Sequence, residues 1–376
     1  MKSQLYIRLF FVLATMAFGA VNAQNNTTKS VLSEHTWYRF SVTEDGIYKL
    51  NYQDFQNLGI DMQLLNPNHI RIFGNEAGLL SEKCGDPRYD DLSELALQVV
   101  GAEDGRFDTD DYVLFYGQHP SKWVLGQRRD TIDRVPTVSE QYDIERNYYS
   151  DSTYYFLCVN SGEEGRRIGH RASATVQNAT TVITEFRDYA YHEVELMTPF
   201  FSGRNWYGEQ LTSGDPVISF EQVLPDLVKS KELKMNARVM GRTSGNMYFS
   251  VKVNDNILQD KVQIVKPGDV SYGIEKTFAR MFFSDSDTLT IRFEMTPDVI
   301  GSTLFIDYFQ LNFWRHLKRV GDYYPFRITP DQYGEGDYST VWVQNVPLHF
   351  VLWDVTQPLS PYEQEYSNTG GNMLFV

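Results

Sequence analysis

Apolar and polar residues alternate with a period of two through much of the second half of the chain. The pattern is clear in residues 233–239, 249–253 and 289–295, where apolar side chains would share one face of a strand. Such alternation indicates antiparallel sheets with one buried face and one wet face. With turns between the strands, it predicts a β-sandwich of jelly-roll type over residues 184–320, ending in a long strand at 304–313.

The first half of the chain has a mixed pattern. Residues 41–50 combine alternating apolar positions with an Asp-Gly turn, which predicts a β-hairpin. Asn51 suits the N-cap of a short helix over residues 52–58, and Gly59 suits its end. We therefore expect a β-rich α+β domain over residues 37–180, so that the whole protein is mainly β.

Further along this region, apolar runs at 112–116 and 153–159 predict buried strands. The polar residues 117–150 between them predict an exposed loop with little regular structure. After the sandwich, residues 321–376 predict a third, smaller β region with strands at 340–343 and 349–355.

Both ends of the chain carry information. Residues 1–23 have a charged start, a short apolar core and small residues at the cleavage site, which predicts a secretory signal peptide. Residues 24–36 predict a polar leader. No later segment is long and apolar enough to predict a membrane span. We therefore expect an exported protein of the periplasm, outer membrane or cell surface. The apolar strand predicted at 372–376, without a polar tail, suggests truncation.

The net charge and the cysteine content disfavour several classes of protein. The formal net charge of −15 disfavours nucleic acid and anionic membranes, since both bind basic patches. The chain has only Cys84 and Cys158, so it is not a disulfide scaffold. One bridge between them is possible, and two free thiols are the preferred interpretation.

Several short motifs follow one another in a fixed order. They are Glu-Asp-Gly-Ile-Tyr-Lys at 44–49 and the segments 51–60, 70–74, 104–108, 112–117 and 353–358. In this order they resemble the N-terminal region of the type IX secretion system sortases, relatives of the gingipain-type cysteine peptidases. The resemblance recurs at 305–313 and 351–358, so it spans nearly the whole exported chain. One departure is the segment 74–78, where the family is richer in glycine.

The resemblance implies an activity for complete relatives. Those proteins are cysteine peptidases that remove a C-terminal sorting signal from cargo and attach the cargo to a surface anchor. Their catalytic Cys and His lie in a domain that follows the matched region, so no residue here is assigned a catalytic role. We expect a chain ending at Val376 to lack that domain and to dock, position or restrain it. The implied partners are the gingipain-type peptidase domain and surface components of type IX secretion.

An acidic turn is a candidate calcium site. Residues 103–111 hold five carboxylates and a turn glycine, and Asp104, Asp108 and Asp110 are the predicted ligands, since calcium prefers several oxygen donors on a tight loop. The spacing of an EF-hand loop is missing. The alternative is a solvated turn between strands. No other cofactor is expected.

Aromatic residues offer a second candidate chemistry. They make up 14% of the chain, and Trp206 and Tyr207 form the best loop for stacking on a sugar ring. The competing interpretation is that the aromatic side chains fill the sheets. This chemistry suggests one rival function, a secreted carbohydrate-binding or adhesion module. A third hypothesis follows from the resemblance to the peptidase family: a free-standing inhibitor of a gingipain-type peptidase.

Overall fold

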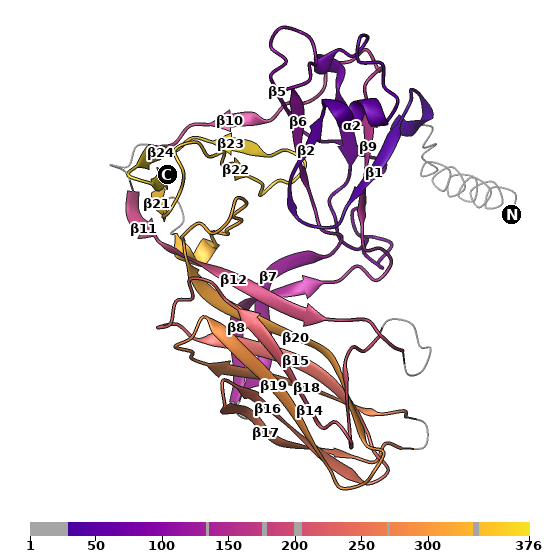
Figure 1. The fold of residues 1–376 in the computed structure, drawn as a ribbon, viewed down its shortest axis with the longest axis vertical. Helices are drawn as coiled ribbons and strands as arrows, with labels where there is room; N and C mark the ends of the chain where they lie inside the picture. The colour runs from indigo at the N-terminus through magenta and orange to yellow at the C-terminus, as the bar shows by residue number, and fades with distance from the viewer. Residues whose placement is uncertain (1–28, 133–134, 175–178, 199–204, 269–270, 334–337) are drawn as a thin grey trace, which may run out of the picture.

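The computed structural model describes residues 29–376 except 133–134, 175–178, 199–204, 269–270 and 334–337. Strands dominate, and Figure 1 shows a β-rich N-terminal lobe above a larger β-sandwich, with the C-terminal segment 321–376 beside both. The predicted mainly β fold is therefore confirmed. Within the described residues, no helix has the length and apolar character needed to cross a membrane.

Two antiparallel sheets form the N-terminal lobe. The first has the order β1 (Tyr38–Val42), β9 (Thr153–Cys158), β3 (Arg71–Gly74) and β4 (Ser93–Glu94). The second has the order β2 (Gly46–Asn51), β6 (Tyr112–Gly117) and β5 (Gln98–Val100). Their facing side chains, including the fully buried Phe115 and Tyr155, make one hydrophobic core. The strands predicted at 112–116 and 153–159 are confirmed.

The hairpin predicted at 41–50 is wrong. Strand β1 pairs with β9 and strand β2 pairs with β6, so the turn carries the chain from one sheet to the other. Both strands still turn apolar residues toward a common core, where the rings of Phe40 and Tyr48 lie 5.4 and 5.6 Å from Phe115. Alternation alone cannot distinguish this crossing from a hairpin.

The short helix is confirmed as α2 (Tyr52–Asn57). The Asn51 side chain accepts a hydrogen bond from Asp54 N (3.1 Å), and Asn51 N donates to Asp54 Oδ2 (2.8 Å). This reciprocal capping box satisfies amides that a helix start leaves free. Gly59 follows at φ +78°, which suits glycine best. The described residues also include the 3₁₀ turns η1 (Val31–Ser33), η2 (Pro67–His69) and η4 (Pro330–Gln332).

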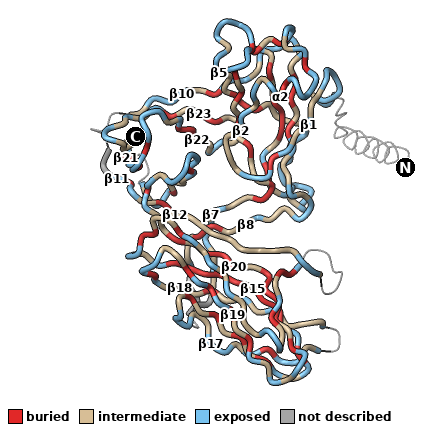
Figure 2. The backbone as a smooth tube through the Cα atoms, in the orientation of Figure 1, coloured by how far each residue is buried: buried red, intermediate tan, exposed pale blue. Residues whose placement is uncertain are grey.

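Two antiparallel sheets also form the sandwich. One has the order β12 (Glu185–Glu193), β20 (Thr303–His316), β15 (Leu233–Arg242) and β18 (Ile274–Phe282), with β13 (Gln210–Thr212) pairing with β20. The other has the order β14 (Val217–Val223), β19 (Thr288–Pro297), β16 (Asn246–Val253) and β17 (Asn256–Val265). From β13 to β20, successive strands alternate between the sheets except for the hairpin of β16 and β17, and this crossing between sheets is typical of a jelly roll. The side chains between the two sheets form one hydrophobic core, and Figure 2 shows buried residues interleaved with more exposed ones along the strands.

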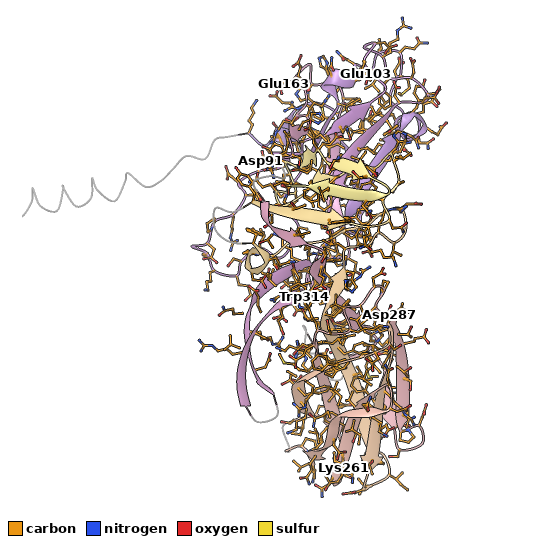
Figure 3. The ribbon with its side chains drawn as sticks, turned by 90° about the vertical axis from the view of Figure 1, so that its left-hand side faces the viewer. Asp91, Glu103, Glu163, Lys261, Asp287 and Trp314 are labelled. Atoms are coloured by element: carbon orange, nitrogen blue, oxygen red, sulfur yellow. The ribbon has the colours of Figure 1, made fainter. Side chains whose placement is uncertain are left out.

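Residues 117–150 do not form the predicted loop. They contain a long antiparallel hairpin, β7 (Lys122–Ile132) and β8 (Val135–Glu145). Figures 1 and 3 show it beside the sandwich, whose outer face it covers. The prediction failed because polar residues dominate the segment, and much of its attachment consists of hydrogen bonds to polar residues of the sheet. Aromatic contacts of Trp123 and Tyr142 with Tyr189 add to these bonds.

The C-terminal segment joins the other parts through two small sheets. One has the order β10 (Gly169–Arg171), β23 (Tyr362–Gln364) and β22 (Trp353–Asp354). The other has the order β11 (Ala179–Ile183), β21 (Tyr338–Val343), β25 (Asn372–Phe375) and β24 (Ser367–Thr369). The strand predicted at 349–355 is reduced to Trp353–Asp354. Leu352 packs in one hydrophobic cluster and Trp353 in another. The predicted domain boundaries stay a prediction.

Candidate functional site

A groove of about 1270 Å³ lies between the N-terminal lobe, the sandwich and the C-terminal segment. We call it the interdomain groove. Its walls are rich in aromatic side chains, which include Tyr116, Trp123, Tyr189, Tyr323 and Trp353, and the cation Arg327 lies among them. They come from strands and loops far apart in the sequence. The fold therefore assembles this surface, and no local motif does.

One wall of the groove is a stack at the junction of three elements. The rings of Trp123 on β7 and Tyr189 on β12 lie 3.7 Å apart and nearly parallel. Tyr142 on β8 meets Tyr189 edge-on at 5.3 Å. The Arg327 guanidinium lies 4.5 Å from the Tyr189 ring and donates to its hydroxyl (2.5 Å). Asp188 lies 3.5 Å from the same guanidinium, so the charge of Arg327 has a partner.

Burial governs the ionisation of the groove tyrosines. It raises the pKa of Tyr116, and it also raises the pKa of Tyr189 although the nearby Arg327 opposes this. Both phenols therefore keep their protons at neutral pH. Two further polar atoms of groove residues, Trp353 Nε1 and Ser339 Oγ, are buried without a hydrogen-bond partner. The groove thus offers aromatic faces, which suit binding of a polypeptide, whereas these two polar atoms are enclosed by the chain itself.

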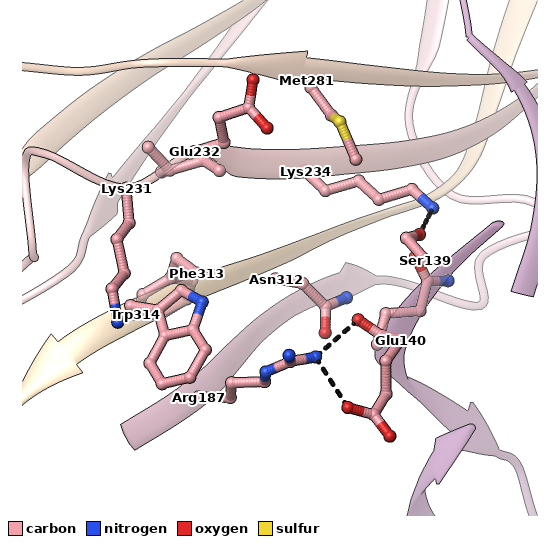
Figure 4. Close-up of a pocket in the computed structure, with 12 residues that line it drawn as sticks. Ser139, Glu140, Arg187, Lys231, Glu232, Lys234, Met281, Asn312, Phe313 and Trp314 are labelled. Carbon is pink, nitrogen blue, oxygen red and sulfur yellow. Dashed lines mark hydrogen bonds and ion pairs between the residues drawn. The ribbon is translucent and has the colours of Figure 1, made fainter. Parts of the chain in front are cut away.

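A second, smaller cavity of about 310 Å³ lies between the hairpin and the sandwich (Figure 4). Trp314 stands in it between two cations, with Lys231 Nζ 3.6 Å and Arg187 Cζ 5.0 Å from the ring centroid. Both cations already have carboxylate partners: Lys231 binds Glu185 (2.6 Å) and Arg187 binds Glu140 (3.2 Å). This cavity therefore serves the attachment of the hairpin.

Buried polar contacts hold the rest of the hairpin on the sheet. Lys234 Nζ on β15 contacts Asp130 Oδ2 (2.5 Å) and Ser139 Oγ (2.7 Å). Tyr142 N donates to Asn312 Oδ1 (2.7 Å), and Asn312 Nδ2 donates to Tyr142 O (3.0 Å). These paired bonds fix the register of β8 against β20.

The predicted calcium ligands lie together on an exposed turn. Asp104 Oδ1 accepts from Arg106 N (2.9 Å), and Asp108 N donates to the neighbouring Asp111 Oδ2 (2.7 Å). Asp104, Asp108 and Asp110 are all exposed. Over the part of the chain that the structure describes, no group of three or more His, Cys, Asp or Glu side chains is arranged to hold a metal ion. The calcium site stays a prediction.

The two predicted ligand-facing aromatic residues, Trp206 and Tyr207, lie in different environments. Trp206 is 40% exposed, whereas Tyr207 is 4% exposed. Tyr207 packs with Met240 and Phe305 and donates its hydroxyl to Glu275. The prediction for Tyr207 is corrected on this point, because its ring fills a small hydrophobic cluster and cannot stack on a sugar in solvent. A role for Trp206 stays a prediction.

The cysteines form no disulfide. Cys84 is a free thiol on the surface, and Cys158 is a free thiol buried in β9. This agrees with the preferred interpretation from the sequence.

Comparison with known proteins finds a similarity in fold. No protein-family model matches the chain, and no curated protein matches it in sequence. In fold it is similar to the crystal structure of dimeric latent PorU from Porphyromonas gingivalis, with a TM-score of 0.68 and 20% sequence identity. The similarity covers 92% of this chain and 30% of the PorU chain. The chain therefore has a PorU-like fold and spans less than a third of that protein's length.

A carbohydrate-binding structure is a much weaker match. The family 35 carbohydrate binding module from Clostridium thermocellum has a TM-score of 0.22 and 14% identity, over 34% of this chain and 95% of that chain. A likeness of this level supports no inference about the sandwich.

Sequence reasoning missed the residues that build the groove and dock the hairpin. Tyr323, Arg327 and Trp353 reach the groove from a segment without clear periodicity. The one available signal was Lys234, a charged residue inside an otherwise regular sandwich strand. A charge at that position is ordinary on a wet face, so it did not reveal the hairpin above it.

Proposed function

We propose that this chain is the non-catalytic N-terminal portion of a type IX secretion sortase-like protein, in which it positions or restrains a gingipain-type peptidase domain. The observation that supports this proposal is the PorU-like fold, which extends over 92% of the chain. The ordered motifs of the sequence point the same way. In this proposal the protein is exported through the predicted signal peptide and works at the outer membrane or cell surface.

The interdomain groove is the proposed contact surface. Tyr323 and Val351 line it and are each 47% exposed, so apolar area at the groove is open to a partner. A catalytic domain resting here would cover these side chains.

The first experiment mixes the purified chain with a gingipain-type peptidase domain and measures affinity by titration calorimetry. We expect a complex, and we expect the double variant Tyr323→Ala/Val351→Asp to bind at least about tenfold more weakly, as for truncation of interface anchors. Ile257→Asp is the matched control, because Ile257 is 60% exposed on β17 of the sandwich. Its affinity should equal that of the unaltered chain.

Peptidase activity in the same mixture separates the possible roles. A lower rate with the complex indicates restraint, and an unchanged or higher rate indicates positioning. Absence of any complex would contradict the proposal. Binding to a glycan that is lost in Trp206→Ala would instead support a carbohydrate-binding or adhesion function, since Trp206 is the exposed member of the predicted aromatic pair.

A further inference from the structure

Lysine and arginine side chains of this protein contact an aromatic ring and a carboxylate at the same time in several places. Arg171 Cζ lies 4.9 Å from the ring centroid of Tyr362, and its guanidinium pairs with Asp354. Lys231 and Arg327, described above, have the same two kinds of partner. The face of the ring and the charge of the carboxylate both attract the cation. We call a ring and a carboxylate that can hold one cation in this way a cation box.

Asp45 and Tyr323 provide the parts of another cation box in the interdomain groove, which both residues line. Asp45 Oδ1 accepts a hydrogen bond from His119 N (2.8 Å), which fixes the carboxylate on the groove wall. The Tyr323 side chain is open to solvent. Burial raises the pKa of Tyr116, and the charges of Asp45 and Tyr323 raise it further. The three side chains therefore lie in the same part of the groove.

The groove's own cations do not fill this box, because the lysine and arginine side chains that line it have other carboxylate partners. These pairs are Lys122 with Glu76, Arg171 with Asp354 and Arg327 with Asp188. By contrast, neither Asp45 nor Asp322, which precedes Tyr323 and also lines the groove, forms an ion pair with any described residue. A cation from a partner would find a counter-charge here that the chain itself does not use.

We propose that the partner in the groove presents a basic surface, with an arginine or lysine that pairs with Asp45 and stacks on the ring of Tyr323. This inference rests on the proposed function, so the partner is the gingipain-type peptidase domain, and it adds the chemistry of the contact. Arginine fits the box best, since its planar guanidinium stacks on a ring and offers two N–H groups to one carboxylate. An acidic surface would be repelled by Asp45 and Asp322.

Titration calorimetry of the whole chain with the gingipain-type peptidase domain tests the box through Asp45→Asn. Asparagine removes the charge but keeps an oxygen that can accept from His119 N. We expect the dissociation constant to rise at least about tenfold, as for loss of one partner of a shielded charge pair. The difference from the unaltered chain should shrink at 1 M salt, because salt screens the lost attraction.

The matched control is Asp285→Asn, which removes the same charge from an exposed position between β18 and β19. Its affinity should equal that of the unaltered chain. A complex whose affinity is the same for Asp45→Asn and Asp285→Asn would overturn the cation box and leave the proposed function standing.

A second probe separates the box from the proposed function. A blocked peptide of sequence Gly-Ser-Arg-Ser-Gly is titrated into the chain at millimolar concentration, and the ring signals of Tyr323 are followed by NMR. A peptide with citrulline in place of arginine has the same shape without the charge. If the peptidase domain forms no complex, the proposed function fails, and this titration decides on the box. A shift caused by the arginine peptide alone, and lost in Asp45→Asn, supports it; equal shifts with both peptides overturn it.

Discussion

Replacement of Lys234 by alanine is expected to release the β7–β8 hairpin from the sandwich. The Lys234 side chain is 6% exposed and pairs with Asp130, which is 10% exposed. Its loss leaves the buried Asp130 carboxylate with Arg128 (3.0 Å) as its remaining ion-pair partner. Removal of one partner from a buried pair costs up to about 3–5 kcal/mol. Urea unfolding should show this loss, and hydrogen exchange should place it in Lys122–Ile132 and Val135–Glu145.

Two further variants make the interpretation specific. Lys318→Ala removes a comparable ion pair with Asp226 (2.9 Å), but Lys318 is 48% exposed. An exposed pair contributes only about 0–1 kcal/mol, so this control should change little. The double variant Lys234→Met/Asp130→Leu should recover most of the lost stability, because apolar residues often replace a buried pair at no cost. If Lys234→Ala behaves like Lys318→Ala, the hairpin is not held by this pair.

The docked position of the hairpin could not be predicted from the sequence. On β15 and β20, the residues between the core positions are polar, and alternation assigns them to a wet face. In the structure Asn236 and Gln310 are 1% and 2% exposed, because the hairpin lies over them. Gln141 from β8 is 1% exposed and accepts from Asn236 (3.4 Å). The strands were predictable from their period. The sequence could not show whether their polar face is exposed to water or covered by a polar hairpin, because the residue types are the same in both cases.

The acidic turn and the interdomain groove also differ in how far the sequence could predict them. The acidic turn with Asp104, Asp108 and Asp110 is local, so the sequence could predict that these residues lie together. The interdomain groove depends on contacts such as Trp123 with Tyr189 and Arg327 with Tyr189, across up to 138 positions of sequence. Neither side of such a pair carries a pattern that identifies the other. For this reason the fold class was predictable, and the binding surface was not.

The second large effect is expected in the sandwich core, where Phe309→Ala should lower the free energy of unfolding by about 3–5 kcal/mol, as for other buried Phe-to-Ala changes. Phe309 is 2% exposed, and its ring centroid lies 5.2 Å from that of Phe220 and 6.2 Å from that of Phe293. These two rings come from the opposite sheet, so truncation opens a cavity where the two sheets meet. Urea unfolding followed by near-ultraviolet circular dichroism measures the loss.

Phe283→Ala is the matched control for this core variant, because Phe283 is 60% exposed and its truncation should change stability by no more than about 0.5 kcal/mol. Phe309→Leu should fall between the two, since leucine refills part of the cavity. Equal losses for Phe309→Ala and Phe283→Ala would contradict the assignment of Phe309 to the core. Because Phe309 lies on the strand that also carries Asn312 and Asp307, a loss confined to the sandwich would show that its core folds independently of the hairpin docked on its outer face.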